Sequence, residues 1–155
     1  MFIHIKGNQA NIYRFGIGEE IYILKHYYKW ENNEALILSK LSHPNIIKLQ
    51  TSGLINGEQC VIMNYFEGKP LDKINNKIST QLDSVLSYFK KIGLKHRDLN
   101  PTSILVDGED EIKIIDFGWA SMPNIPLRQI VPPTINGYYS SDDDKAVEML
   151  KEKFK

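Results

Sequence analysis

Short apolar segments separated by turn residues make up the first part of the chain. Three of them, residues 1–5, 11–15 and 21–24, are rich in Ile, Phe and Tyr, and glycines lie between them. β-Branched and aromatic residues in short runs bounded by turn residues favour strands. The sequence therefore predicts an antiparallel meander with a glycine turn between its first two strands.

A helical spacing of apolar residues replaces this pattern over residues 31–41. Ala35, Leu38 and Leu41 recur at intervals of three residues, and Pro44 follows the run. Positions three and four residues apart lie on one face of a helix, and proline cannot continue a helix. We expect a helix of about three turns after the meander.

Two more strands are predicted at residues 47–55 and 59–66. Asn56 and Gly57 join them. Both residues tolerate the positive φ that a two-residue hairpin turn requires. Together with the meander, this hairpin gives a predicted antiparallel sheet of about five strands.

Beyond Gly68 the spacing of apolar residues becomes helical. The apolar side chains of residues 81–91 fall on one face, which is typical of an amphipathic helix. A proline-rich loop over residues 123–133 precedes a second, shorter helix predicted at about 141–154. Three aspartates at 142–144 fall in its first turn, where the helix dipole favours negative charge.

Composition and charge narrow the class of protein. The 155 residues suit one domain, and 19 Lys and Arg balance 19 Asp and Glu, so no overall charge attracts the chain to nucleic acid or to an anionic membrane. The single cysteine, Cys60, lies in an apolar run and suits a buried thiol in a reducing compartment. No apolar run is long enough to span a bilayer, and no secretory leader is recognisable. We expect a cytoplasmic protein without a nucleic-acid partner or a membrane span.

Two acidic motifs frame one more predicted hairpin. Its strands are residues 104–106 and 112–115, with His-Arg-Asp at 96–98 before them and Asp-Phe-Gly at 116–118 after them. Antiparallel pairing of the two strands brings the flanking segments together. We therefore expect both motifs at one rim of the hairpin.

The runs 96–106 and 114–118 resemble the catalytic loop and the metal-binding motif of the eukaryotic-type protein kinase superfamily. Their order, their spacing and the hairpin between them all agree with that family. The resemblance implies an α+β fold of two lobes within one domain, residues 1–155. A five-stranded antiparallel sheet with one helix would form the N-lobe, about residues 1–66, and a reduced helical C-lobe would follow over about 67–155. ATP would lie between the lobes.

The resemblance also assigns roles to residues of the N-lobe. Lys25 is similar to the lysine of the third strand that contacts the phosphates, and Glu34 to the helix glutamate that pairs with it. Met63 stands where the family has the gatekeeper at the end of the fifth strand. The Asn64 carbonyl and the Phe66 amide would face the purine edge.

The glycine-rich loop departs from the family's pattern. Aligning Ile12 with the valine that follows this loop leaves Ile5, Gly7 and Ala10 where the family has three glycines. The middle glycine, Gly7, is kept, and its missing side chain lets backbone amides approach the phosphates. Gly7 and Ile12 are therefore expected to contact the nucleotide through a loop that is stiffer than usual.

The catalytic loop carries two further departures. By resemblance Asp98 would accept or orient the acceptor hydroxyl proton, and Asp116 would hold Mg²⁺ or Mn²⁺. Asn100, which could hydrogen-bond the transferred group, stands in place of a lysine, and Ser103 replaces the asparagine that holds a second metal. A serine hydroxyl is a shorter and weaker metal ligand than an amide carbonyl. One firmly held metal, or low activity, is the hypothesis that follows.

Two structural roles follow from the same resemblance. Asp143 aligns with the helix-capping aspartate that braces the catalytic loop, with Asp142 and Asp144 as alternatives. The hydrophobic spine of the family is expected to consist of four side chains: Leu38, Leu54, His96 and Phe117.

The predicted function is transfer of the γ-phosphate of ATP to a hydroxyl, most simply Ser or Thr of a protein. The stretch after Gly118 lacks an Ala-Pro-Glu signature, and the chain ends about where the family begins the helices that shape its peptide-docking surface. A protein partner that completes the C-lobe is therefore one expectation. Residues 116–120 and the Ser-Asp-Asp run also resemble small bacterial kinases that act on sugars of surface glycans and lipopolysaccharide, so a glycan acceptor is an alternative. A pseudokinase that binds nucleotide or serves as a scaffold is the other.

Overall fold

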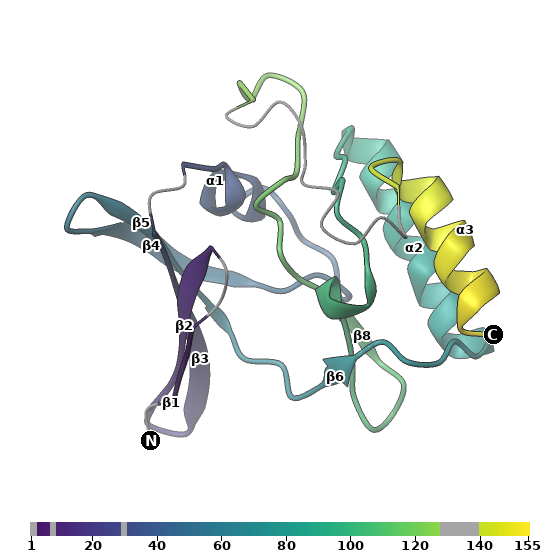
Figure 1. The fold of residues 1–155 in the computed structure, drawn as a ribbon, viewed down its shortest axis with the longest axis horizontal. Helices are drawn as coiled ribbons and strands as arrows, with labels where there is room; N and C mark the ends of the chain where they lie inside the picture. Colours follow the sequence, from purple (N-terminus) through teal and green to yellow (C-terminus); the bar gives the residue numbers. More distant parts are fainter. Residues whose placement is uncertain (1–2, 7–8, 29–30, 128–139) are drawn as a thin grey trace.

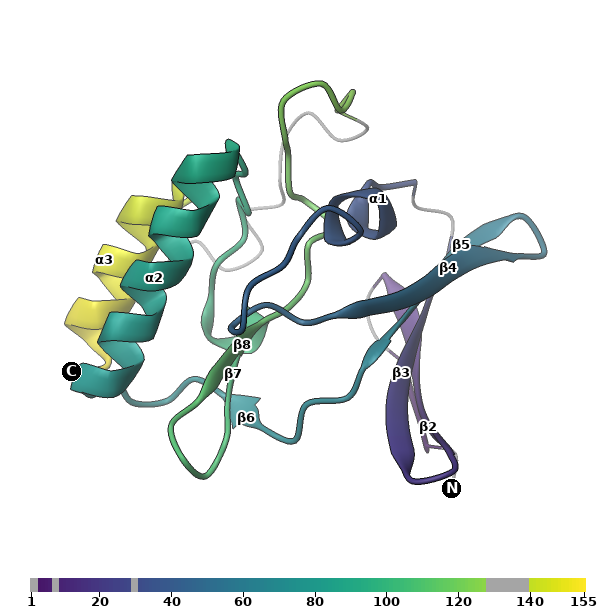
Figure 2. The same cartoon turned by 180° about the vertical axis from the view of Figure 1, so that it is seen from behind.

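A sheet and a pair of long helices lie on opposite sides of the protein in the computed structural model, which describes residues 3–6, 9–28, 31–127 and 140–155 (Figures 1 and 2). The sheet has five antiparallel strands in the order β1-β2-β3-β5-β4. Their bounds are β1 Ile3–Lys6, β2 Ala10–Ile17, β3 Glu20–Tyr27, β4 Leu49–Ile55 and β5 Glu58–Asn64. The predicted α+β, two-lobed architecture with a five-stranded antiparallel sheet is confirmed.

The β4–β5 hairpin turns at the predicted residues. Asn56 and Gly57 have φ values of 52° and 79°, so both central positions of the turn lie in the left-handed region that a two-residue hairpin favours. Cys60 in β5 is buried, as the apolar run around it predicts.

The helix of this lobe is much shorter than predicted. α1 spans Glu34–Leu38, five residues instead of about three turns, so the prediction over 31–41 was wrong. At its start the Asn32 side chain accepts a hydrogen bond from the Glu34 amide, which favours a turn over a helix. After Leu38 the backbone bonds tighten, because the amides of Lys40 and Leu41 bond to carbonyls only three residues earlier.

The second lobe begins with the long helix α2, Asn76–Ile92. It is longer than the predicted 81–91, because the Asn75 side chain caps it by accepting from the Ile78 amide several residues before the predicted start. Gly93, with φ of 73°, ends it in the left-handed conformation. α3, Asp143–Lys153, packs beside α2 in both views of the fold (Figures 1 and 2). Among the described residues, no helix has both the length and the apolar character that a membrane span requires.

A small sheet joins the two halves. The predicted hairpin is present as β7 Ile104–Val106 and β8 Ile112–Ile114, preceded by the short 3₁₀ helix η1, Pro101–Ser103, and flanked by the strand β6, Lys69–Pro70. The Ile114 amide donates to the Asn45 carbonyl, and the Ile114 carbonyl accepts from the Ile47 amide. These bonds attach the hairpin to the segment that leads into β4, so the two lobes are held together at the rim where the motifs lie.

The core contains three of the four predicted spine residues. Leu38, His96 and Phe117 are buried, and the His96 and Phe117 rings meet edge to face with centroids 4.7 Å apart. Leu54 is 69% exposed, so its assignment to the spine was wrong. It lies near the tip of the β4–β5 hairpin, which extends beyond the body of the protein (Figure 1), whereas Leu49 at the other end of β4 packs against the core.

Candidate active site

A cavity of about 200 Å³ lies where the two lobes meet. Four of the residues predicted to bind the nucleotide line it, namely Ile12, Met63, Asn64 and Phe66. Sequence reasoning missed four further apolar residues of its wall: Ile23, Ile47, Leu105 and Ile115. Lys25 and Asp116 form its polar side. Gly7 lies outside the described residues.

Lys25 is the centre of the polar side. Its ammonium lies 3.1 Å from Glu34 Oε1 and 2.9 Å from Asp116 Oδ1, so β3, α1 and the segment after β8 meet at one cation. Lys25 is 8% exposed and Glu34 is fully buried. Burial disfavours the ammonium, but the charges of Asp116 and Glu34 outweigh burial and raise the pKa of Lys25 well above its ordinary value. The lysine is therefore a fixed positive charge at the edge of the cavity.

Glu34 accepts from two more donors. The Tyr27 hydroxyl donates to Oε1 at 2.5 Å, and the Phe117 amide donates to Oε2 at 2.6 Å. Tyr27 was not singled out from the sequence. The period-two alternation of β3 was the available signal, because it places Tyr27 on the same face as Lys25.

Both acidic motifs contain a residue in a strained backbone conformation. Arg97 and Asp116 have φ values of 72° and 61°, in the region that costs non-glycine residues of order 1–3 kcal/mol. The conformation at Asp116 turns the chain directly after β8, where the Asp116 side chain meets Lys25. Strain of this kind is concentrated at functional sites.

The catalytic loop surrounds Asp98 with its own hydrogen bonds. Asn100 Nδ2 donates to the Asp98 carbonyl at 2.9 Å and to Asp98 Oδ1 at 3.3 Å, while Asn100 Oδ1 accepts from the Thr102 amide at 2.9 Å. Burial raises the pKa of Asp98, and the charge of Asp116 adds to that rise against the opposing effects of His96, Asn100 and Lys25. Asn100 thus lies beside Asp98 and orients its carboxylate.

Ser103 is fully buried, and its hydroxyl is engaged within the same loop. Ser103 Oγ accepts from the Asn100 amide at 2.9 Å and lies 3.1 Å from the Asp98 carbonyl, to which it can donate. The bond from the Asn100 amide is one half of the capping box of η1, and the Asn100 side chain accepts the other half. The structure therefore places Ser103 against the backbone of the catalytic loop, and among the described residues no hydrogen bond joins its hydroxyl to Asp116.

The donor set suits a magnesium ion only in part. Among the residues that the structure describes, no cluster of three or more His, Cys, Asp or Glu side chains could hold a metal ion. Mg²⁺ in nucleotide sites is commonly held by one or two carboxylates together with phosphate oxygens and water. Asp116, 41% exposed at its side chain and next to Lys25, fits that mode.

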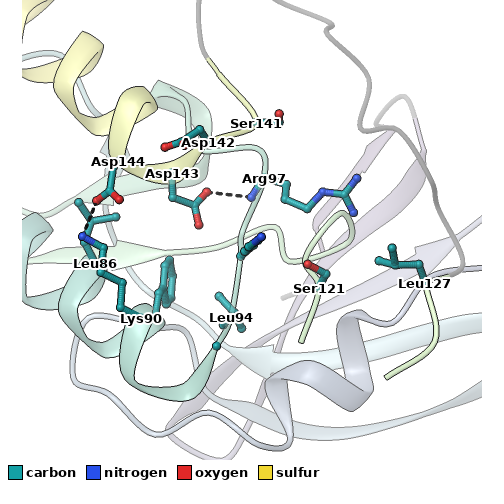
Figure 3. Close-up of a pocket in the computed structure, with 13 residues that line it drawn as sticks. Leu86, Lys90, Leu94, Arg97, Ser121, Leu127, Ser141, Asp142, Asp143 and Asp144 are labelled. Carbon is teal, nitrogen blue, oxygen red and sulfur yellow. Dashed lines mark hydrogen bonds and ion pairs between the residues drawn. The ribbon is translucent and has the colours of Figure 1, made fainter. Parts of the chain in front are cut away.

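Asp143 braces the catalytic loop from behind (Figure 3). Its two carboxylate oxygens accept from the backbone amides of His96 and Arg97 at 2.7 and 2.9 Å. Asp142 instead caps α3, and Asp144 pairs with Lys90. The prediction for Asp143 is confirmed over its two alternatives.

A larger cavity, about 640 Å³, lies between α2, the catalytic loop and the start of α3 (Figure 3). Its wall includes Leu86, Leu94 and Arg97. None of the predicted catalytic, nucleotide-binding or metal-binding residues lines it. The smaller cavity is the candidate active site because Lys25 and Asp116, which were predicted to bind phosphate and metal, meet at its wall.

Comparison with known proteins points to one family. Residues 20–126 match the protein kinase domain. The chain is 34% identical over 99 residues to the serine/threonine-protein kinase PAK mbt of Drosophila melanogaster, a match that covers 57% of this chain and 16% of the relative. It is 30% identical over 120 residues to cyclin-dependent kinase 1 of Encephalitozoon cuniculi, a match that covers 68% of this chain and 40% of the relative.

A bacterial relative is similar at the same level. The probable serine/threonine-protein kinase PknB of Lactococcus lactis is 31% identical over 98 residues, covering 56% of this chain and 16% of the relative. The chain thus spans between 16% and 40% of the length of these three relatives.

Proposed function

The chain belongs to the protein kinase family, and from that premise we propose that it transfers the γ-phosphate of ATP to a hydroxyl group, with Ser or Thr of a protein as the acceptor. One observation carries the proposal: the Lys25 ammonium contacts both Glu34 and Asp116 at the polar side of an otherwise apolar cavity. An apolar pocket suits a purine, and a fixed cation beside it suits a phosphate. The names of the relatives support the acceptor class.

The base would lie between apolar side chains of the two lobes. Ile12 and Met63 come from the sheet, and their positions in the cavity support this placement. The Asn64 carbonyl and the Phe66 amide are the proposed partners of the purine edge. Gly7, outside the described residues, is the proposed loop contact of the phosphates.

The chain's charged residues would then align the reaction. Lys25, held by Glu34, binds phosphate oxygens, and Asp116 holds Mg²⁺ or Mn²⁺, which when bound neutralises charge that develops on the phosphates. Asp98 takes the proton as the acceptor oxygen bonds to the γ-phosphorus and the bond to the leaving ADP oxygen breaks. Asn100 keeps the Asp98 carboxylate oriented. Because it lies in the same loop, Asn100 is also the proposed hydrogen-bond partner of the transferred phosphoryl group.

Binding and turnover of ATP test this proposal together. ATP with Mg²⁺ at one hundred times its Kd is expected to stabilise the chain by about 2.7 kcal/mol and to raise its Tm by roughly 5–10 °C. Label from the γ-position of ATP should then appear on casein as phosphoserine or phosphothreonine. The absence of both a shift in Tm and a transfer of label would contradict the proposal.

The same assay separates the alternatives. A shift in Tm without turnover indicates the pseudokinase. One observation favours this alternative: the Ser103 hydroxyl is already bonded within the catalytic loop, which weakens the case for Ser103 as a second metal ligand. Transfer of label to a sugar but not to casein indicates a glycan kinase. The surroundings of the loop over residues 123–139 would also distinguish a sugar pocket from a peptide groove, and positions 128–139 of this loop lie outside the described residues.

Ser103 is predicted to act mainly on the catalytic loop. Ser103→Ala removes the acceptor of the Asn100 amide, and we expect it to lower the free energy of unfolding by about 1–2 kcal/mol. The Mg²⁺ concentration for half-maximal turnover should stay within about twofold of the wild-type value, because the described contacts of this hydroxyl are with the backbone of Asp98 and Asn100 and not with Asp116. Urea unfolding and a Mg²⁺ titration measure the two effects. A several-fold rise in the Mg²⁺ requirement would instead support Ser103 as a metal ligand.

A further inference from the structure

β3 carries a second buried polar side chain beside Lys25. Tyr27 is 1% exposed, and its hydroxyl donates to Glu34 Oε1 at 2.5 Å. The Lys25 ammonium lies 5.2 Å from the centroid of the Tyr27 ring. A buried phenol that donates to a buried carboxylate forms a short, strong hydrogen bond.

The three donors of Glu34 differ in whether they also bond to another acceptor at the site. Lys25 contacts both carboxylate oxygens, at 3.1 and 3.3 Å, but it is shared with Asp116 at 2.9 Å. The hydroxyl of Tyr27 and the amide of Phe117 donate one to each oxygen. Two of the three bonds therefore hold Glu34 without using the ammonium.

The helix that carries Glu34 gives it little support of its own. α1 has five residues, which is too short to be stable by itself. The Asn33 side chain at its N-cap donates to the Pro126 carbonyl instead of capping the helix. The position of the Glu34 carboxylate therefore depends on the side chains and amides that bond to it.

We propose that Tyr27 is a positioning residue for phosphotransfer: its hydroxyl holds Glu34 in place, so that the Lys25 ammonium is free to exchange Asp116 for a phosphate oxygen. This inference rests on the proposed function. Without the hydroxyl, Oε1 of Glu34 would depend on Lys25 alone, and the carboxylate would compete with the phosphate for the ammonium. Burial and the charge of Glu34 also raise the pKa of Tyr27 well above its ordinary value, so the phenol keeps its proton at neutral pH.

The test compares ligands that do and do not reach Lys25. In Tyr27→Phe we expect ATP with Mg²⁺ to bind about tenfold more weakly, the effect of one hydrogen bond to a charged group, while adenosine affinity stays within about twofold. Calorimetric titration measures both affinities. Tyr88→Phe is the matched control, because it removes a hydroxyl that accepts from the Ser42 amide, outside the cavity, and should change neither affinity.

Each outcome bears on the inference. A preferential loss of ATP affinity supports it, whereas unchanged ATP affinity, or an equal loss for ATP and adenosine, overturns it while the proposed function stands. A wild-type chain that binds no ATP overturns the proposed function and the inference with it. Tyr27→Met repeats the test with a side chain of similar length that lacks the donor, should Tyr27→Phe fail to fold.

Discussion

Asp98→Asn is expected to reduce phosphotransfer by about 10²–10⁴-fold while leaving ATP affinity unchanged. The asparagine has the same shape and keeps an oxygen to accept from Asn100, so the catalytic loop should hold its conformation. An amide, however, cannot take the proton of the acceptor hydroxyl. Burial raises the pKa of Asp98, so the carboxylate is a stronger base than an exposed aspartate would be.

The control for this prediction is Asp72→Asn. Asp72 is exposed and forms a surface pair with Lys69, so its substitution should alter neither rate nor binding. Initial rates at saturating ATP, together with the shift in Tm that ATP produces, separate catalysis from binding. Similar rates for Asp98→Asn and the wild type would contradict the assignment of Asp98.

The sheet and the position of the charged residues could be predicted because both follow from short-range patterns. Asn56 and Gly57 specify their turn by backbone preference alone. Asp98 and Asp116 flank a hairpin, and the pairing of its strands at Ile104–Ile114 brings the two motifs together whatever the rest of the fold does. Where local residue preferences and strand pairing agree, the sequence is enough to predict the element and the residues that flank it.

Helix length and burial could not be predicted in the same way, because both depend on the surrounding structure. The apolar spacing over residues 31–41 is helical, yet the helix ends at Leu38, where tighter backbone bonds replace it. Leu54 has the apolar character of a core residue, but it lies on a hairpin that extends past the packed region. The strand Lys69–Pro70 is too short to leave any pattern.

The hydrogen-bond partners of the hydroxyl groups could not be predicted from the sequence either. Ser103 was named from its position and Tyr27 was not, and nothing in the pattern indicated that Ser103 Oγ accepts from the Asn100 amide or that the Tyr27 hydroxyl donates to Glu34. Both contacts depend on the backbone path of several segments. The hydrogen-bond partners at this site are therefore the part that required the structure.

Replacing Lys25 with Met is expected to lower the free energy of unfolding by about 3 kcal/mol. Glu34 is fully buried, and without the ammonium its carboxylate would lose its cation. The loss of one partner of a buried pair typically costs about 3–5 kcal/mol, because an uncompensated charge stays in the interior. The Tyr27 hydroxyl and the Phe117 amide still donate to Glu34 in this variant, so we expect a loss of stability at the lower end of that range.

The double variant Lys25→Met/Glu34→Gln is expected to be more stable than Lys25→Met alone, since it removes the stranded charge. A double-mutant cycle by urea unfolding should give a coupling free energy of about 1–3 kcal/mol. Lys77→Met is the control, because Lys77 pairs with Glu111 on the surface and water screens its loss. Equal destabilisation by Lys25→Met and Lys77→Met would contradict a buried pair at this site.

The ion pair of Lys25 and Glu34 is also expected to affect ATP affinity, separately from its effect on stability. The double variant restores a neutral interior but lacks the cation beside the cavity, so it should fold and still bind ATP no better than Lys25→Met does. Adenosine should bind both variants equally well, because the proposed base contacts, Ile12 and Met63, lie on the cavity wall and neither variant changes them. Recovery of ATP affinity together with stability would mean that Lys25 serves the fold and not the phosphates.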